Sequence, residues 1–333
     1  MISAAISGCA YNGKNGNDNL NSVPDSSVAM NTDADADAAS ASDKDTAADT
    51  SDVMTDTPSK PSGTDDNHGD EPYMLDFVDV FSEHYQVMID PSFPMHKYSE
   101  AGFDIENDLK TYEDDSFISR AGIDVSKYQG HVDYDKLKDI GIEFVFIRLG
   151  YRGYGKSGVI KADPLFEENF VKASEAGFDV GVYFFSQAIN EQEALEEADF
   201  VLDRLNSIKE KYPEEYEAKL GIVYDPESIL DDIARTDDVT REQFTLNALA
   251  FLERINDNGY KPIIYCNMLW EAFMLDMGKL YDHGYSVWYA DYEEMPQTPY
   301  EFEFWQYTNE GRIDGINGGA DIDIQMLPKS NTH

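Results

Sequence analysis

Apolar runs alternate with amphipathic segments along the chain from residue 120 onward. Short apolar runs bounded by turn residues are typical of buried strands, whereas apolar residues at helical spacing indicate helices that pack one face inward. We expect eight strands, at residues 122–126, 144–150, 180–186, 220–227, 261–267, 285–292, 302–308 and 320–324. Helices are expected at residues 134–140 and 269–277, and after caps at Asp163, Asn190 and Thr240.

The order of these elements predicts the fold class. The first five strands are each followed by a helix and the last three are not, so we expect an α/β protein built as a closed, parallel-type barrel that is degenerate in its last third. In such barrels the active site lies at the C-terminal ends of the strands. Polar residues at those ends are therefore the first candidates for chemistry.

Two carboxylates end the fourth expected strand. Side chains two apart on a strand face the same side, so Asp225 and Glu227 project together. Paired carboxylates hydrolyse glycosidic bonds. Asp-Pro-Glu also suits the start of a helix, with Pro at the first helical position, so this segment alone leaves both interpretations open. Acidic or amide groups at other strand ends favour a site: Asp124, Asp291, Gln306, Asp321 and Asp323.

Residues 150–157 match the P-loop pattern of nucleotide-binding proteins letter for letter, and they follow an apolar strand. A phosphate loop needs a helix to begin at its Lys-Ser step, so that the helix N-terminus faces the phosphates. Here Gly158-Val159-Ile160 follows, and the next helix cap is at Asp163-Pro164. We therefore expect no nucleotide binding and interpret the segment as an aromatic loop at the barrel rim.

The first 119 residues differ in composition from the rest. Residues 10–70 are almost wholly small and polar, with Tyr11 as their one aromatic residue. Such a segment cannot bury enough surface to offset the entropy of ordering, so we expect a disordered acidic linker. Residues 71–119 contain short alternating apolar runs, and we expect an ordered arm there that packs on the main domain. The sequence does not indicate the role of this arm.

The two cysteines lie in different contexts. Residues 6–9, Ile-Ser-Gly-Cys, are similar to a bacterial lipobox, in which the cysteine is lipidated after signal-peptide cleavage. The alternative is a stray Cys9 in an unstructured terminus. With the lipobox, residues 1–9 would be a signal remnant and the protein extracellular, secreted or lipid-anchored at the bacterial cell surface. Cys266 lies in an apolar run and is expected to be buried, so no disulfide framework is predicted.

Charge and histidine spacing exclude several classes of partner. The formal net charge is −41, of which about −10 lies in residues 10–70, so the remainder is strongly acidic too. Phosphate binding needs clustered Lys and Arg, which argues against nucleic acid and anionic membrane surfaces. The six histidines are scattered without metal-ligand spacing. We expect no metal site and no cofactor.

Residues 120–327 resemble the family 25 glycoside hydrolases, the Chalaropsis-type lysozymes or N-acetylmuramidases. The resemblance rests on motifs in family order: Gly122-Ile123-Asp124-Val125-Ser126, Asp163-Pro164 with Asn169, Ala176-Gly177 with Val180-Gly181-Val182-Tyr183-Phe184, Tyr224-Asp225-Pro226-Glu227, Trp288-Tyr289-Ala290-Asp291-Tyr292, Trp305-Gln306-Tyr307-Thr308, and Gly315-Ile316 with Asp321-Ile322-Asp323. It implies a catalytic domain over residues 120–330, a (β/α)5(β)3 barrel, and cleavage of the β-1,4 bond between N-acetylmuramic acid and N-acetylglucosamine in peptidoglycan.

The resemblance also implies roles for individual residues. Glu227 matches the family's general acid, and Asp225 the carboxylate beside it, which acts as nucleophile or orients the substrate's acetamido group. Asp124 and Asp321 match the acidic residues of the first and last strands. The expected sugar-binding residues are Tyr183, Tyr265, Trp288, Asp291, Trp305 and Gln306.

The chain departs from the family pattern at two positions. Phe184 stands where many members have His, and Asp323 where many have Asn. We expect the extra carboxylate to shift pKa values without removing a catalytic group, and nearby like charges and aromatic walls to keep Glu227 protonated. Two alternatives stay open: a non-catalytic wall-binding module, and a barrel glycosidase acting on chitin-like glycans. A monomer is expected.

Overall fold

The computed structural model describes residues 71–212, 216–229 and 232–329. The expected signal remnant with Cys9 and the expected acidic linker at residues 10–70 lie outside the described residues. No helix in the described ranges is long and apolar enough to cross a membrane.

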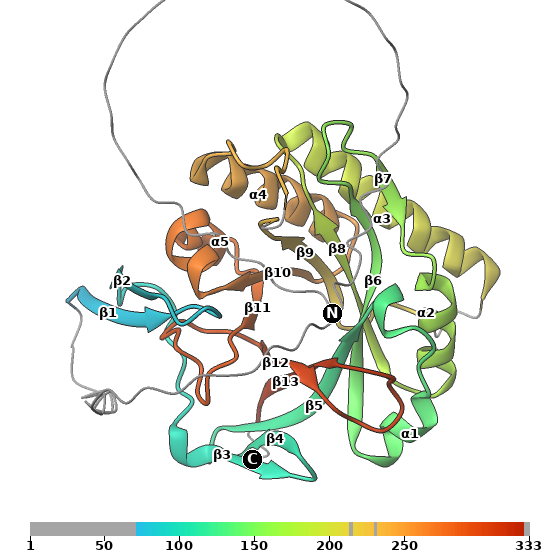
Figure 1. The fold of residues 1–333 in the computed structure, drawn as a ribbon, viewed down its shortest axis with the longest axis horizontal. Coiled ribbons are helices and arrows are strands. Elements are labelled where there is room, and N and C mark those ends of the chain that lie inside the picture. The colour runs from blue at the N-terminus through green and yellow to red at the C-terminus, as the bar shows by residue number, and fades with distance from the viewer. Residues whose placement is uncertain (1–70, 213–215, 230–231, 330–333) are drawn as a thin grey trace, which may run out of the picture.

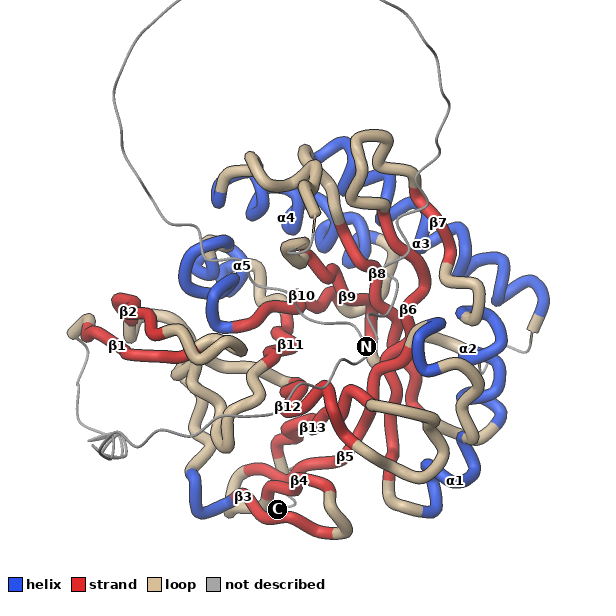
Figure 2. The backbone as a smooth tube through the Cα atoms, in the orientation of Figure 1, coloured by secondary structure: helices blue, strands red, loops and turns tan. Residues whose placement is uncertain are grey.

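Within the described residues, eight strands close into a barrel (Figures 1 and 2). They are β5 (Phe117–Val125), β6 (Ile142–Arg152), β8 (Asp179–Ser186), β9 (Gly221–Pro226), β10 (Pro262–Asn267), β11 (Ser286–Ala290), β12 (Phe304–Gly311) and β13 (Ala320–Pro328). Pairing is parallel from β5 through β12, but β13 is antiparallel to both β12 and β5, where it closes the ring. The expected parallel-type barrel is therefore mixed, because the short link from β12 to β13 allows only a hairpin.

Helices cover the outside of one part of the barrel (Figure 1). They are α1 (Tyr134–Asp139), α2 (Phe166–Glu175), α3 (Glu191–Lys211), α4 (Arg241–Asp257) and α5 (Met277–Asp282). The side chains of Asn190 and Thr240 cap α3 and α4 as expected. The helix expected at residues 269–277 is instead a π-helical turn, Trp270–Met274, followed by α5.

The segment with the P-loop pattern forms a hairpin. Strand β6 continues to Arg152, and the chain returns as β7 (Ile160–Ala162), antiparallel to β6. A phosphate loop requires a helix that begins at the Lys-Ser step, and no helix begins at Lys156-Ser157. The expected cap at Asp163 is wrong by two residues: α2 starts at Phe166, and its N-cap is Leu165, whose side chain cannot accept a hydrogen bond.

Alternation along the barrel strands separates two cores. Side chains that point outward pack against the helices in one large cluster, and those that point inward fill the barrel with a smaller, mostly aromatic cluster around Phe146 and Trp288. Glycines make room for the inner rings. An added Cβ at Gly122 would lie 2.3 Å from the Phe144 ring, and one at Gly181 would lie 2.3 Å from the Phe146 ring.

The arm at residues 71–119 forms two hairpins. The first pairs β1 (Tyr73–Val78) with β2 (His84–Ile89), and the second pairs β3 (Phe103–Glu106) with β4 (Leu109–Tyr112). Phe77, Leu109 and Tyr112 are buried and belong to the outer core of the barrel. The two hairpins therefore pack on the barrel, and Figure 1 shows the first beside β11 and α5.

Candidate active site

A pocket lies where inward-facing side chains meet at the C-terminal ends of the parallel strands. We call it the carboxylate pocket. It is lined by Asp124, Arg148, Tyr183, Phe185, Asp225, Glu227, Tyr265, Trp288, Tyr292, Gln306 and Asp321. It contains all four expected catalytic carboxylates, and four of the six expected sugar-binding residues.

Strand β9 carries the central pair into the pocket. Val223 belongs to the inner cluster and Tyr224 to the outer one, so Asp225 points inward again and Glu227 follows on the same side. The strand runs to Pro226, and α4 begins only at Arg241. Asp-Pro-Glu therefore ends a strand and does not start a helix within the described residues.

Burial governs the protonation of the central pair. It raises the pKa of Glu227 to about 7, against the lowering effects of a hydrogen bond with Tyr265 and the positive charge of Arg148. It also raises the pKa of Asp225 well above its usual value, and the charges of Glu227 and Asp124 add to this effect. We expected neighbouring charges to act on Glu227 as well, but burial is the main cause there.

A hydrogen-bond network orients Asp124 at the end of β5. Gln306 Nε2 donates to Asp124 Oδ2 at 2.6 Å, while Gln306 Oε1 accepts from the hydroxyls of Tyr292 at 2.8 Å and Tyr265 at 3.1 Å. Burial raises the pKa of Asp124 to about 7, although the hydrogen bond from Gln306 opposes this. Gln306 thus positions the carboxyl group of Asp124 within the pocket that it lines.

Strand β13 adds two more carboxyl groups. Asp321 lies opposite Asp124 in the antiparallel register. Asp323 is fully buried below it: its Oδ1 accepts from Trp288 Nε1 at 2.8 Å, and its Oδ2 has no hydrogen-bond partner in the described structure. Burial is the main cause that raises the pKa of Asp323 well above its usual value, and the charge of Asp124 raises it further. The extra carboxyl group therefore sits under the pocket, where it favours the neutral form.

Arg148 is the cationic residue among those that line the pocket, and our sequence reasoning missed it. Its Nε and Nη2 both donate to Asp163 Oδ2, at 2.8 and 2.6 Å. Asp163 also accepts from the backbone N–H groups of Lys127 and Leu165, so this pair ties the ends of β5 and β6 to the start of α2. The sequence did contain a signal for Arg148, because it is the single charged residue within the apolar run at residues 144–150. Tyr292 was also missed.

Three of the expected aromatic residues line the pocket. The Trp288 ring stacks on Phe146 with centroids 4.5 Å apart. The rings of Tyr265 and Tyr183 make T-shaped contacts with Trp288, with centroids 4.9 and 5.9 Å from it. Trp288 is almost completely buried, so it forms the floor of the pocket. Tyr183 and Tyr265 form walls above it.

The structure does not bring Asp291 and Trp305 into the pocket. Trp305 lies between the inward-facing Phe304 and Gln306, so strand alternation turns it into the outer core. Its Nε1 donates to the backbone carbonyl of Asp291 at 2.8 Å. Asp291 follows the inward-facing Ala290, and its carboxylate accepts from the Tyr289 hydroxyl at 2.7 Å. Both residues therefore support the rim from outside, as does Phe184, which is buried in the outer core.

No group of three or more His, Cys, Asp or Glu residues in the described ranges is arranged to hold a metal ion. The pocket chemistry that the structure offers is that of carboxyl groups, one guanidinium group and tyrosine hydroxyls.

Comparison with known protein families identifies the family of this chain. Residues 123–316, more than half of the chain, match the model of the glycosyl hydrolases family 25. The chain belongs to glycosyl hydrolase family 25. The resemblance inferred from the motifs is thereby confirmed, and the protein is a glycoside hydrolase.

Relatives of the family 25 chain include named lysozymes. The autolytic lysozyme of Clostridium acetobutylicum is 23% identical over 203 residues, which cover 61% of this chain and 54% of that protein. Lysozyme M1 of Streptomyces globisporus is 24% identical over 246 residues, which cover 68% of this chain and 77% of that protein. The chain therefore spans about half of the first relative and most of the second.

A solved structure shares the fold. The modular autolysin LytC from Streptococcus pneumoniae, solved in complex with a synthetic peptidoglycan ligand, superposes with a TM-score of 0.53 at 19% identity. The match covers 75% of this chain and 56% of that one.

Proposed function

We propose that this family 25 enzyme hydrolyses peptidoglycan at the β-1,4 bond between N-acetylmuramic acid and N-acetylglucosamine. The observation that carries the proposal is the pairing of Asp225 and Glu227 in a pocket walled by further carboxyl groups and aromatic rings. Glycoside hydrolysis requires two such carboxyl groups at one site. The named lysozymes among the relatives support peptidoglycan as the substrate.

Glu227 is the general acid in this mechanism. The leaving oxygen needs a proton, and a pKa of about 7 keeps a substantial fraction of Glu227 protonated at neutral pH. Asp225 acts from the same strand, either as nucleophile or by orienting the substrate's acetamido group. In both roles an ionised carboxylate stabilises the positive charge that develops on the sugar ring. Burial and the neighbouring carboxyl groups raise the pKa of Asp225 and so oppose this ionised form, whereas the positive charge of Arg148 lowers that pKa and favours it.

We also assign the barrel to the (β/α)5(β)3 class that the family resemblance implies. Helices α1 to α5 after β5, β6, β8, β9 and β10 support this assignment, as do the direct loops after β11 and β12 in the described chain.

We further propose that the enzyme acts outside the cell, tethered through a lipid on Cys9. The lipobox-like residues 6–9 and the long polar segment that follows them support this proposal. Labelling cells with a fatty-acid analogue tests it: the wild-type protein should take up label, and Cys9→Ser should not. An unlabelled wild-type protein would contradict the tether.

Substitution of the general acid tests the central proposal. Glu227→Gln keeps the shape of the side chain but cannot supply the proton, so release of reducing sugar from purified cell walls should fall by about 10²–10⁴-fold. Glu175→Gln is the matched control, because Glu175 is exposed on α2 and should leave the rate unchanged.

Three results would contradict parts of this proposal. Equal release of reducing sugar by the wild type and Glu227→Gln would show that Glu227 is not the general acid. Wall binding by the wild type without release of reducing sugar would favour a non-catalytic module. Cleavage of chitin oligomers but not of peptidoglycan would show that the substrate is a chitin-like glycan. Mass spectrometry of the released muropeptides identifies the bond that is cut.

A further inference from the structure

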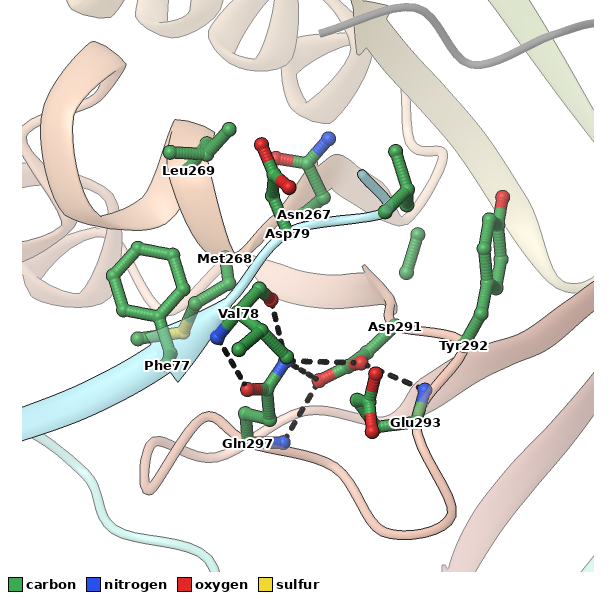
Figure 3. Close-up of a pocket in the computed structure, with 12 residues that line it drawn as sticks. Phe77, Val78, Asp79, Asn267, Met268, Leu269, Asp291, Tyr292, Glu293 and Gln297 are labelled. Atoms are coloured by element: carbon green, nitrogen blue, oxygen red, sulfur yellow. Dashed lines mark hydrogen bonds between the residues drawn. The ribbon is translucent and has the colours of Figure 1, made fainter. Parts of the chain in front are cut away.

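A second pocket lies between the β1–β2 hairpin and the ends of β10 and β11 (Figure 3). Its wall includes Val80 from the turn of the hairpin and, from the barrel side, Asn267, Leu269 and Tyr292. The hairpin at residues 73–89 lies outside residues 123–316, which match the family model. This wall is therefore an addition of this chain to the matched family region.

The second pocket continues the mouth of the barrel. Tyr292 lines both this pocket and the carboxylate pocket, so the two pockets adjoin at this side chain. Asn267 and Ala290 come two residues after the inward-facing Tyr265 and Trp288, and they also line the second pocket. A linear ligand that fills the carboxylate pocket can therefore extend past Tyr292 toward the hairpin.

The hairpin is held firmly against the barrel rim. Val78 N donates to Gln297 Oε1 at 2.8 Å, and Gln297 Nε2 donates back to Val78 O at 2.9 Å. The backbone N–H of Gln297 donates in turn to Asp291 Oδ2 at 2.8 Å, directly after β11 (Figure 3). Phe77 is buried in the outer core beside this link. The hairpin is thus a fixed wall of the second pocket.

The turn of the hairpin is built to present its apolar tip. Asp79 Oδ1 accepts from the backbone N–H of Phe81 at 2.8 Å and of Glu83 at 3.0 Å. Ser82 adopts a φ of 62°, a left-handed conformation that non-glycine residues rarely take. Val80, which is 43% exposed, faces the pocket as a result. Such preorganisation lowers the entropy cost of binding.

The lining favours an acetamido group. Oxygens of the Asp79 and Asp291 carboxylates already accept hydrogen bonds from their own turns, so they offer few positions to a ligand. The third carboxyl group of the lining, Glu293, is exposed to solvent. Asn267 Oδ1 accepts from Trp270 N at 3.0 Å, and no hydrogen bond within the described residues uses its Nδ2. An amide donor beside the apolar Val80 and Leu269 matches a carbonyl oxygen next to a methyl group.

We propose that the β1–β2 hairpin and the barrel rim form a subsite for an N-acetylhexosamine unit of the glycan strand whose scissile bond lies in the carboxylate pocket. The acetamido carbonyl accepts from Asn267 Nδ2, and its methyl group packs on Val80 and Leu269. This inference rests on the proposed function, because it extends the same glycan strand beyond the catalytic carboxylates.

Binding by the full chain carrying Glu227→Gln tests the subsite, because this variant can be saturated without cleavage. Calorimetry is run with peptide-free glycan strands long enough to span both pockets, and with a short fragment that fills the carboxylate pocket alone. Added Val80→Glu or Asn267→Ala should weaken binding of the long strand about tenfold, the equivalent of about 1.4 kcal/mol. Binding of the short fragment should not change.

Met88→Glu is the matched control. Met88 is 57% exposed on β2 and does not line the pocket, so a charge there should not affect either ligand. Undiminished binding of the long strand by both variants would overturn the subsite alone. A parallel titration uses peptide-bearing strands: if the two substitutions weaken binding of these strands but not of the peptide-free ones, the sugar assignment is overturned in favour of the stem peptide. Absence of any glycan binding by the Glu227→Gln parent would overturn the proposed function as well.

Discussion

Arg148 is the residue on which the electrostatics of the carboxylate pocket depend. Its charge lowers the pKa values of Asp124, Asp225 and Glu227, all of which burial raises. Its guanidinium is itself nearly buried and is bound to Asp163, which is buried too. One side chain therefore joins the protonation of the site to the stability of the barrel rim.

Replacing Arg148 should change both properties at once. Arg148→Met leaves Asp163 buried without its cation, which should lower the free energy of unfolding by about 3–5 kcal/mol. Loss of the positive charge also raises the pKa of Glu227 further. Because activity needs protonated Glu227 and falls as pH rises through about 7, this fall should move to higher pH. Denaturant unfolding and a pH–rate profile measure the two effects.

Arg148→Lys separates the two roles. Lysine keeps the charge but loses the two-pronged contact with Asp163, so stability should fall while the alkaline limb of the profile stays in place. An unshifted limb in Arg148→Met as well would mean that Arg148 acts on structure alone.

At the scale of elements, the floor of the pocket depends on close packing between β6, β8 and β11. Gly181 on β8 lies opposite Phe146 on β6 in the parallel register. The missing side chain at Gly181 makes room for the Phe146 ring, which stacks in turn on Trp288 of β11. The floor is therefore sensitive to a single added methyl group.

Gly181→Ala should overpack this floor. The new Cβ would lie 2.3 Å from the Phe146 ring, so the ring must shift, at a cost of about 1–3 kcal/mol in stability. Activity should fall as well, because the ring supports Trp288. Gly155→Ala is the matched control, since an added Cβ there meets nothing within 4 Å. Equal unfolding midpoints for the two variants in denaturant would refute the packing argument.

At the scale of the molecule, buried carboxyl groups also lie outside the pocket. Burial raises the pKa of Glu197 to about 7, although Ser186 and Arg152 bind it. Burial raises the pKa of Glu271 to about 8, although its Oε1 accepts from Thr298 Oγ1 at 2.6 Å. The folded protein therefore holds protons that the unfolded chain releases at lower pH.

Stability should consequently fall as pH rises from about 4.5 to about 8. In this interval the folded state binds more protons than the unfolded state, so the free energy of unfolding decreases with pH. Glu271→Gln removes one such group and should flatten the decline, whereas the exposed Glu175→Gln should not. Thermal melts across this range provide the measurement. A stability that rises with pH in the wild type would contradict the prediction.

The local alternation of apolar and polar residues predicts most of the strands and helices. It also predicts that Asp225 and Glu227 point inward. This alternation did not predict which side of the barrel wall Asp291 and Trp305 face, because a shift of one residue along a strand turns the side chain to the opposite face of the sheet. Both belong to family-like motifs, but the inward positions of their strands are Ala290, Phe304 and Gln306. The antiparallel direction of β13 was also missed, since chain direction leaves no trace in apolar alternation.

By itself, the sequence determined the family, the order of barrel elements and the carboxylates at the strand ends, because these depend on local motifs and periodicity. Only the tertiary structure decided which groups share the pocket. It brought Arg148 to the acids, placed Asp323 beneath them, and set the β1–β2 hairpin against the rim beside Tyr292. These are contacts between residues far apart in the chain, and they arise from strand register and barrel closure, which no single segment encodes.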